Sequence, residues 1–206
     1  MSEAKAEVLQ RIRSALAASP PTPVTIPRDY DRLPLSGPGD VDRFAEAVEE
    51  YRARVHRVDR TAVAAAVAVL VTTTGRIVVP EDVPANWVTD LDTAKDSSSQ
   101  PLSVADLDSA DAVVTGCALG IAATGTVVLD AGATQGRRAL TLVPDHHICV
   151  VFTDQIVDTV PQAFARLDPG RPLTFISGPS ATSDIELDRV EGVHGPRTLD
   201  VLIVDR

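Results

Sequence analysis

Short apolar runs rich in valine, leucine and isoleucine are the sequence feature that most constrains the fold. In the second half of the chain, such runs occur at 112–115, 125–131, 148–153, 173–177 and 199–204. Runs of this length and composition, bounded by glycine, proline or polar residues, are typical of strands. Apolar strands that are separated by helices favour a parallel sheet with helices on its faces. The sequence therefore predicts an α/β fold.

The expected elements alternate along most of the chain. Further strands are predicted at 55–58 and 76–80, and helices over 40–53, 59–71, 154–167 and 182–191, with loop and a short helix over 81–110. The run 125–131 follows 112–115 too closely for a helical crossover, so these two strands are expected to form a hairpin or an excursion. The prediction is a mixed, mainly parallel sheet flanked by helices.

The first 39 residues have a different character. Residues 2–18 form an amphipathic pattern with Val8, Leu9, Ile12 and Leu16 on one stripe, and 19–39 contain six prolines. The pattern predicts a helix, and the proline-rich segment predicts an extended, semi-rigid linker. We therefore expect an N-terminal helical arm over 1–39, which either packs on its own domain or contacts a partner, and one domain over 40–206.

Charge and composition exclude several classes of function. The net charge of −10 disfavours nucleic acid and anionic membrane surfaces as partners, since both require basic residues. The longest apolar stretch, 62–71, is too short to span a membrane, and 1–13 have no apolar signal region, so a cytoplasmic protein is expected. Two cysteines cannot supply the four thiolates of an iron–sulfur cluster, and no metal-binding spacing occurs.

The first candidate ligand loop covers residues 115–126, where three glycines and two threonines follow a predicted strand. The glycines lack the spacing of a dinucleotide fingerprint. They either let the backbone approach a ligand closely or pack against a neighbouring strand. The candidate binding residues in this loop are Gly120, Thr124, Gly125 and Thr126.

The second candidate loop covers residues 177–197. Three hydroxyl side chains, those of Ser180, Thr182 and Ser183, lie within four residues at the start of the helix expected over 182–191, where free N–H groups suit an anion. The alternative is a capping box between Ser183 and Glu186. His194 lies in a tight turn, either as a site residue that titrates near neutral pH or as a turn residue bonded to backbone. The candidates here are Ser180, Thr182, Ser183, Asp184, Glu186 and His194.

Arg137 and Arg138 are the only adjacent basic pair. In an acidic chain, such a pair either holds a carboxylate or phosphate or forms surface ion pairs. His146 and His147 are also adjacent, but successive strand residues point to opposite faces and cannot hold one metal ion together.

Several of these segments together resemble the lactate utilization protein C family, whose members carry the LUD domain. The resemblance covers roughly 40–206 and rests on motifs that follow one another in the same order. These are GIAATGT (120–126), DAG (130–132), QGRRAL (135–140), LVPD (142–145), SGPS (177–180), DIE (184–186) and GVHGPR (192–197).

The resemblance implies a fold of the NagB/RpiA/CoA-transferase-like group. It also implies an accessory, non-redox subunit in the oxidation of L-lactate to pyruvate, together with a cysteine-rich protein and an iron–sulfur protein. The iron–sulfur clusters are then expected on these partners, and no cofactor on this chain. We expect a small carboxylate or other anion to bind between the 120–126 loop, Arg137, Arg138 and the segment 180–186.

One residue departs from the family pattern. Ala123 stands where the family usually has glutamate, and CoA transferases of this fold use a glutamate as covalent nucleophile. The catalytic residues, if any, are therefore left unassigned. Two alternatives stay open: a stand-alone enzyme that acts on a phosphorylated or CoA-linked small molecule, and a non-catalytic scaffold whose N-terminal helix docks a partner.

Overall fold

The computed structural model describes residues 3–18, 25–28, 36–71, 75–179, 181–182, 190–191 and 195–205. The chain divides into two units, Met1–Leu33 and Pro34–Arg206. In the first unit, helix α1 (Glu3–Ala18) has no buried residue, so its apolar stripe of Val8, Leu9, Ile12 and Leu16 is exposed. The boundary expected between residues 39 and 40 stays a prediction.

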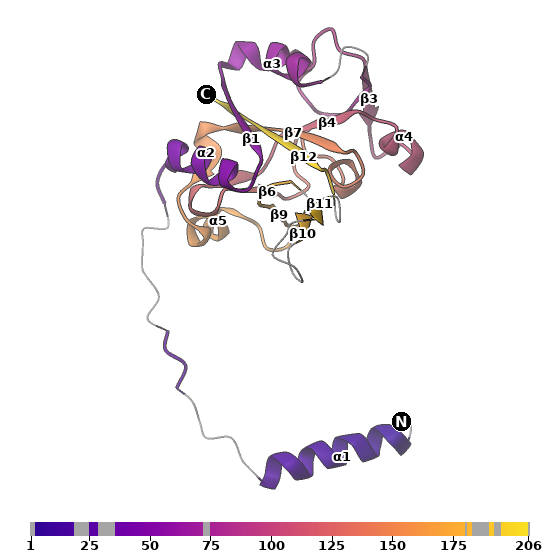
Figure 1. The fold of residues 1–206 in the computed structure, drawn as a ribbon, viewed down its shortest axis with the longest axis vertical. Helices are drawn as coiled ribbons and strands as arrows, with labels where there is room; N and C mark the ends of the chain where they lie inside the picture. Colours follow the sequence, from indigo (N-terminus) through magenta and orange to yellow (C-terminus); the bar gives the residue numbers. More distant parts are fainter. Residues whose placement is uncertain are drawn as a thin grey trace. The chain divides into compact units, whose positions relative to one another are not determined.

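The second unit is built around a six-stranded sheet in the order β1-β12-β7-β4-β2-β3, in which all neighbouring strands pair in parallel. Figure 1 shows β12 between the edge strand β1 and β7. The strands are β1 (Arg54–Val58), β2 (Ile77–Pro80), β3 (Thr93–Asp96), β4 (Ala112–Thr115), β7 (His146–Phe152) and β12 (Thr198–Val204).

A second sheet of four strands has the order β8-β5-β6-β9. Its β5–β6 and β6–β9 pairs are antiparallel, and its β5–β8 pair is parallel. Its strands are β5 (Leu119–Ile121), β6 (Thr126–Leu129), β8 (Ile156–Val157) and β9 (Thr174–Ile176). Two short strands, β10 (Ala181–Thr182) and β11 (Val190–Glu191), form a separate antiparallel pair.

The helices begin and end with recognisable signals. In α2 (Val41–Glu50), the Asp40 side chain accepts a hydrogen bond from the Arg43 N–H at 3.0 Å, as an N-cap does. Helix α4 (Val104–Asp108) begins with a capping box formed by Ser103 and Asp106. The remaining helices are α3 (Val63–Leu70), α5 (Val160–Arg166) and the 3₁₀ segments η1 (Arg60–Ala62), η2 (Ala85–Trp87), η3 (Ala122–Thr124), η4 (Arg138–Thr141) and η5 (Thr153–Gln155).

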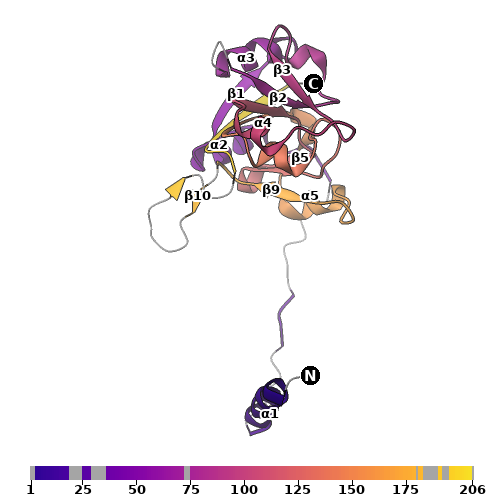
Figure 2. The ribbon, with the colours of Figure 1, turned by 90° about the vertical axis from the view of Figure 1, so that its right-hand side faces the viewer.

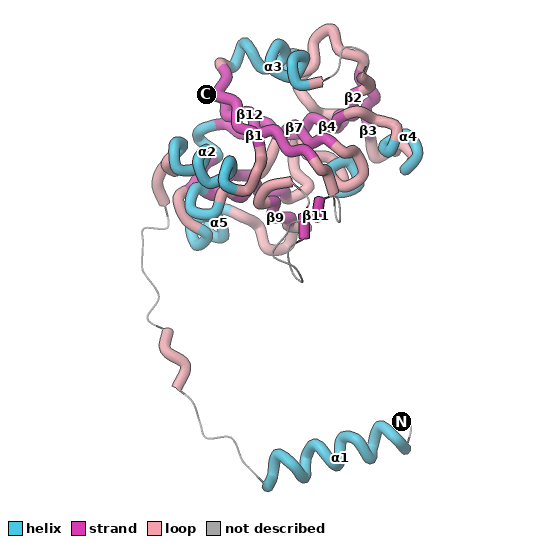
Figure 3. Tube along the Cα trace, in the orientation of Figure 1, coloured by secondary structure: helices cyan, strands magenta, loops and turns pink. Residues whose placement is uncertain are grey.

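The two faces of the six-stranded sheet bury different elements. Alternate residues of β12 point to opposite faces: Leu202 packs with Val63 and Val67 of α3, whereas Val201 packs with Phe44 of α2 and with the second sheet. The far face of the second sheet packs against α5. Figures 2 and 3 show α3 and α5 on opposite sides of the strands. The core is therefore layered, with two sheets between helices.

This architecture confirms the predicted α/β fold with a mostly parallel sheet flanked by helices. Of the two arrangements expected for 112–115 and 125–131, the hairpin is wrong and an excursion fits, because β4 pairs with β2 and β7, whereas β6 pairs with β5 and β9 in the other sheet. Strands β3, β5 and β8, each of two to four residues, were not predicted.

The helix expected over 182–191 is also wrong at both of its ends. Thr182 lies in β10, and Val190 and Glu191 form β11. The backbone between them, 183–189, lies outside the described residues. The expected helix N-terminus for an anion is therefore absent at residue 182, because this residue pairs with Val190 across two antiparallel strands.

Candidate functional site

Helix α2 occupies the space beside Gly120 and Gly125, the two later glycines of the first predicted loop. A side chain on Gly120 would meet the Phe44 ring at 2.9 Å. Gly125 has a φ of +55°, and a side chain there would overlap backbone atoms of Ala47 and Val48. Both glycines therefore pack against a helix rather than a neighbouring strand, and a ligand role for them stays a prediction.

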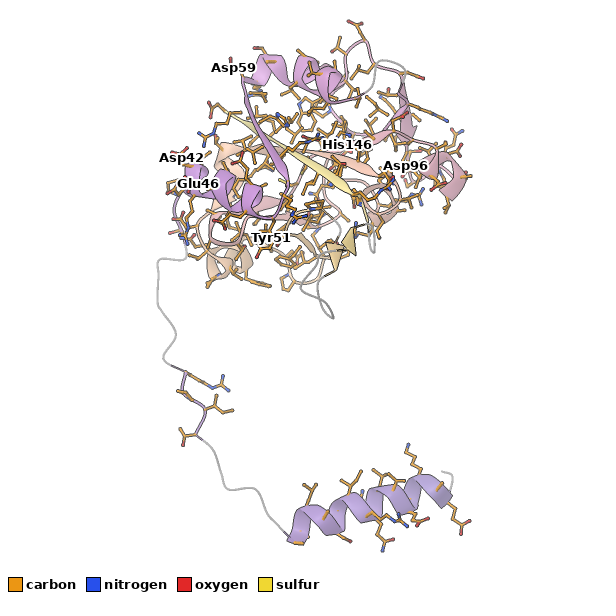
Figure 4. The ribbon with its side chains drawn as sticks, viewed as in Figure 1. Asp42, Glu46, Tyr51, Asp59, Asp96 and His146 are labelled. Carbon is orange, nitrogen blue, oxygen red and sulfur yellow. The ribbon has the colours of Figure 1, made fainter. Side chains whose placement is uncertain are left out.

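Hydroxyl groups connect the two predicted loops. The Thr126 and Thr124 hydroxyls are 2.7 Å apart, and the Thr126 hydroxyl lies 2.8 Å from that of Ser177. Gly178 lies against Tyr51, the residue that ends α2 and is labelled in Figure 4. The start of the second loop therefore meets the end of the first beside α2. A ligand role for Thr124 and Thr126 stays a prediction.

Of the second loop's other candidates, Ser180, Ser183, Asp184, Glu186 and His194 lie outside the described residues, and Thr182 is described by its backbone alone.

The predicted arginine pair is engaged within the protein. Arg137 donates to both oxygens of Asp96, at 2.9 Å from Nε to Oδ2 and from Nη2 to Oδ1, and also to the Leu102 carbonyl at 2.6 Å. Arg138 donates to the carbonyl and hydroxyl of Thr141, at 2.9 and 2.6 Å. Both guanidinium groups therefore stabilise local structure, and among the described residues neither forms a hydrogen bond with the 120–126 loop.

A cavity of about 380 Å³ lies beyond the carboxyl ends of β4 and β7, which are neighbours in the parallel sheet. This is the position at which open α/β sheets commonly bind ligands, and the volume suits a small molecule. We call it the Cys117 cavity. Its walls come from the segments that follow β4, β6 and β7 and from the end of α5: Cys117, Ala118, Leu119, Asp130, Gly132, Ala133, Thr134, Gln135, Gln155, Arg166, Leu167 and Arg171.

One wall of the Cys117 cavity is a bonded cluster around Asp130. Arg171 pairs with Asp130 at 3.2 Å and donates from Nε to its carbonyl at 3.1 Å. Gln135 donates to Oδ1 of Asp130 at 2.8 Å and accepts from its N–H at 2.7 Å. A side chain on Gly132 would meet the Asp130 carboxylate at 2.6 Å, so glycine allows this close approach. The nearby Ala131 and Thr134 have φ values of +52° and +63°, in the left-handed region that non-glycine residues rarely adopt.

A second cavity, also of about 380 Å³, adjoins the first and shares Ala118, Gln155 and Arg166 with it. We call it the Arg60 cavity. Within the described part of the chain, Arg166 makes one hydrogen bond, from Nη2 to the Asp154 carbonyl at 3.3 Å, and Arg60 makes none. The two cavities thus bring three arginines together in a protein of net charge −10. Guanidinium groups with unused N–H donors are suited to carboxylate and phosphate ligands.

The Cys117 thiol lies beside the second thiol of the chain. Cys117 Sγ is 3.8 Å from the Gln155 side-chain oxygen, and Cys149 Sγ is 3.8 Å from the Gly116 carbonyl. A hydrogen bond from Cys117, together with His147 and Thr115, lowers the pKa of Cys149 to about 6 against the opposing effect of burial. The same thiol–thiol contact, together with burial, raises the pKa of Cys117. Both cysteines are free and buried.

A different charged cluster lies at the amino ends of β1, β12 and β7. The Asp200 side chain is fully buried, and it accepts from Arg54 Nε at 2.9 Å, from His56 at 2.7 Å and from His146 at 2.5 Å. His147, by contrast, contacts the Thr115 hydroxyl at 2.8 Å, so the two adjacent histidines do point to opposite faces. Burial raises the pKa of Asp200, but these hydrogen bonds outweigh it and bring the value to about 2. Figure 4 marks His146 beside β12.

Within the described residues, no helix combines the length and apolar character that a membrane span requires. Likewise, this part of the chain contains no group of three or more histidine, cysteine, aspartate or glutamate residues arranged to hold a metal ion.

Comparison with known proteins places this chain in a family. The LUD domain family model matches residues 41–204. A lactate utilization protein C from Deinococcus radiodurans is 47% identical and covers 98% of this chain and 96% of its own length. Another from Shouchella clausii is 32% identical over 53% of this chain and 51% of its own length. The crystal structure of a duf162 family protein from D. radiodurans superimposes with a TM-score of 0.68 at 43% identity, over 80% of this chain and 95% of that one. The chain belongs to the LUD domain family.

Proposed function

We propose that this protein is a non-redox accessory subunit of an L-lactate-oxidising system and binds a small carboxylate in the Cys117 cavity. Family membership and the relatives named lactate utilization protein C support the role in lactate utilization. The observation that carries the ligand assignment is the gathering of Arg60, Arg166 and Arg171 around adjoining cavities in an acidic chain. The electron carriers are then a cysteine-rich and an iron–sulfur partner.

The cavity chemistry suits lactate or pyruvate. Each has one carboxylate next to a hydroxyl or keto oxygen, so it needs a cationic donor and a nearby neutral donor. Arg166 supplies guanidinium N–H groups that have no partner among the described residues, and the Gln135 side-chain amide lies on the same cavity wall. The 380 Å³ volume exceeds that of a three-carbon acid, so the cavity also admits larger carboxylates.

The first test is reconstitution. Lactate-dependent reduction of a dye by the two partner proteins is measured with and without this chain. Dye reduction that requires the chain would support the accessory role. Partners that work equally well alone would contradict it.

The second test is ligand binding by calorimetry with L-lactate and pyruvate, comparing wild type with Arg166→Ala. Loss of a charge-assisted hydrogen bond is expected to weaken binding by about tenfold or more. Arg43→Ala removes the same charge from an exposed position on α2 that lines neither cavity, so it should leave affinity unchanged. Equal affinities of wild type and Arg166→Ala would place the ligand elsewhere.

The alternative enzyme activity meets a structural difficulty. Ala123 is exposed on η3 and lines neither cavity, so the position of the family's usual glutamate is separate from the arginine group. The arginines would nevertheless suit phosphate. Turnover of a phosphorylated or CoA-linked compound by the isolated protein, without lactate or pyruvate binding, would favour this alternative.

The exposed apolar stripe of α1 also supports a second role for the chain, as a scaffold whose N-terminal helix docks a partner. Val8, Ile12 and Leu16 are each about half exposed, at 56%, 49% and 58%. An unburied apolar stripe on a helix is suited to a partner. Deletion of residues 1–39 should then weaken co-purification with the two partner proteins. Intact assembly without residues 1–39 would remove this contribution.

A further inference from the structure

The wall between the Cys117 cavity and the Arg60 cavity is held in place by hydrogen bonds. Ala118, Gln155 and Arg166 line both cavities, so they form this shared wall. The Gln155 side chain donates from Nε2 to the Cys117 carbonyl at 2.8 Å and accepts from the Phe152 N–H at 2.8 Å. A ligand that extends from one cavity into the other therefore passes along a wall that the protein fixes in position.

Both cavities have a net positive charge in their linings. The charged residues of the Cys117 cavity are Arg166, Arg171 and Asp130. Those of the Arg60 cavity are Arg60, Arg166 and Asp154. Two arginines thus accompany one aspartate in each cavity, and Arg166 is common to both. The adjoining cavities therefore offer positive charge at two places rather than one.

The three arginines differ in how far their N–H donors are used. Arg171 is paired with Asp130 at 3.2 Å. Arg166 makes one hydrogen bond, at 3.3 Å to the Asp154 carbonyl, and Arg60 makes none with the residues that the structure describes. Both Arg60 and Arg166 are exposed, so little packing is lost when either side chain turns toward a ligand. The Arg60 cavity therefore provides a second position for a carboxylate.

The surface between the two positions suits a hydrocarbon chain. The Phe152 ring lines the Arg60 cavity and lies against Trp87, with 5.9 Å between the ring centroids. Ala118 lines both cavities, and Leu119 follows it in the Cys117 cavity. A short aliphatic chain can contact these side chains without the burial of an unpaired polar group.

We propose that the two adjoining cavities together bind a small aliphatic dicarboxylate, with one carboxylate in each cavity. Arg171 and Arg166 hold the carboxylate in the Cys117 cavity, and Arg60 and Arg166 hold the other. The inference rests on the proposed function and deepens it, because it adds a second anion position to the site proposed for lactate or pyruvate. A monocarboxylate occupies only one of the two positions.

The second carboxylate should increase affinity by about tenfold or more, because it adds charge-assisted hydrogen bonds that a monocarboxylate of the same length lacks. Since Arg60 is exposed, salt should reduce this advantage. The distance between the two positions also sets the best chain length. Affinity should therefore pass through a maximum as the dicarboxylate lengthens, rather than rise steadily with apolar area.

The test is calorimetry on the full-length protein at low ionic strength. The probes are oxalate, malonate, succinate, glutarate and adipate, each compared with the monocarboxylate of equal carbon number. Wild type should prefer the dicarboxylate at one or two lengths. Arg60→Ala should bring the affinity for that dicarboxylate down to that of its monocarboxylate, whereas Arg60→Lys keeps the charge and should retain part of the preference. Arg43→Ala, which lines neither cavity, should keep the whole preference. Circular dichroism checks that each variant is folded.

Three outcomes would overturn the proposal. Equal affinities for the dicarboxylate and the monocarboxylate at every length would show that there is no second position. An undiminished preference in Arg60→Ala would place the second carboxylate elsewhere. Equal losses in Arg60→Ala and Arg43→Ala would show that only the total charge of the protein matters.

Failure of this proposal is distinguishable from failure of the proposed function. Lactate or pyruvate binding without a dicarboxylate preference would overturn the second position and leave the proposed function standing. A dicarboxylate preference without lactate or pyruvate binding would support the second position and contradict the ligand assigned in the proposed function.

Discussion

The Asp200 cluster and the Cys117 cavity both place arginine beside aspartate, but they use the charges differently. Asp200 is fully buried and accepts hydrogen bonds from Arg54, His56 and His146. In the cavity, the Arg171 side chain is 43% exposed, and Arg166 makes only one hydrogen bond with the described residues. The difference teaches that a saturated ion cluster stabilises the fold, whereas arginines with unused donors remain able to bind a ligand.

The largest expected effect comes from removal of the buried carboxylate. Asp200→Ala should lower the free energy of unfolding by about 3 kcal/mol, because it leaves Arg54, His56 and His146 without their shared partner. Urea denaturation measures the loss. Asp42→Ala, which breaks an exposed pair with Arg57, is the control and should cost less than about 1 kcal/mol. Equal losses for the two variants would remove the distinction between a buried cluster and surface charges.

Acid should produce the next largest effect. The folded pKa of Asp200 is about 2, below the ordinary value of 3.8, because hydrogen bonds from His146, Arg54 and His56 outweigh the opposing effect of burial. A depressed folded pKa stabilises the protein above the unfolded pKa, and this contribution, about 2 kcal/mol, is lost as pH falls from about 4 to about 2.

Asp200→Asn is the isosteric variant that cannot titrate. The difference in free energy of unfolding between wild type and Asp200→Asn should become smaller as pH falls from about 4 to about 2. A difference that stays constant between about pH 5 and pH 2 would contradict the assigned pKa.

The smallest effect distinguishes the two kinds of arginine. Arg137→Ala should lower stability by about 1 kcal/mol and leave carboxylate affinity unchanged, because Arg137 is half exposed and bonded to buried Asp96. Arg166→Ala should show the reverse, with lost affinity and a stability change below about 0.5 kcal/mol. Calorimetry and urea denaturation measure both properties. If Arg137→Ala weakened carboxylate binding, the result would contradict this prediction and would support Arg137 as a ligand-binding residue.

The regular elements of the fold were predictable because their patterns are local. Strand 112–115 was predicted with its observed bounds, and β12 differs by one residue at its start. The unpredicted strands are short, and Thr93–Asp96 contains Lys95 and Asp96, so its sequence has no apolar run. The second sheet was missed because two of its pairings, β5 with β8 and β6 with β9, join strands that are far apart in sequence. Local hydrophobic periodicity carries no information about such pairings.

The candidate site was only partly predictable for a similar reason. The loop after β4 was recognised, and its first residues do line the Cys117 cavity. Arg166 and Arg171 were not recognised, because each is a single arginine about 50 residues from Cys117 with no local motif. The adjacent pair Arg137 and Arg138 was recognisable in sequence, but Asp96, 41 residues earlier, takes up the donors of Arg137.

The strand order carries a consequence for the way the chain folds. Strand β1 pairs with β12 alone, so Arg54 and Asp200, which face each other in the register, are separated by 146 residues. Such non-local pairing slows folding. The chain between the two strands must form a long loop, and the entropy lost on closing this loop is offset only after the strands have paired. During synthesis, β1 has no partner strand until residues 198–204 have emerged from the ribosome. Closure of the sheet edge and burial of the Asp200 carboxylate are therefore late events that occur together.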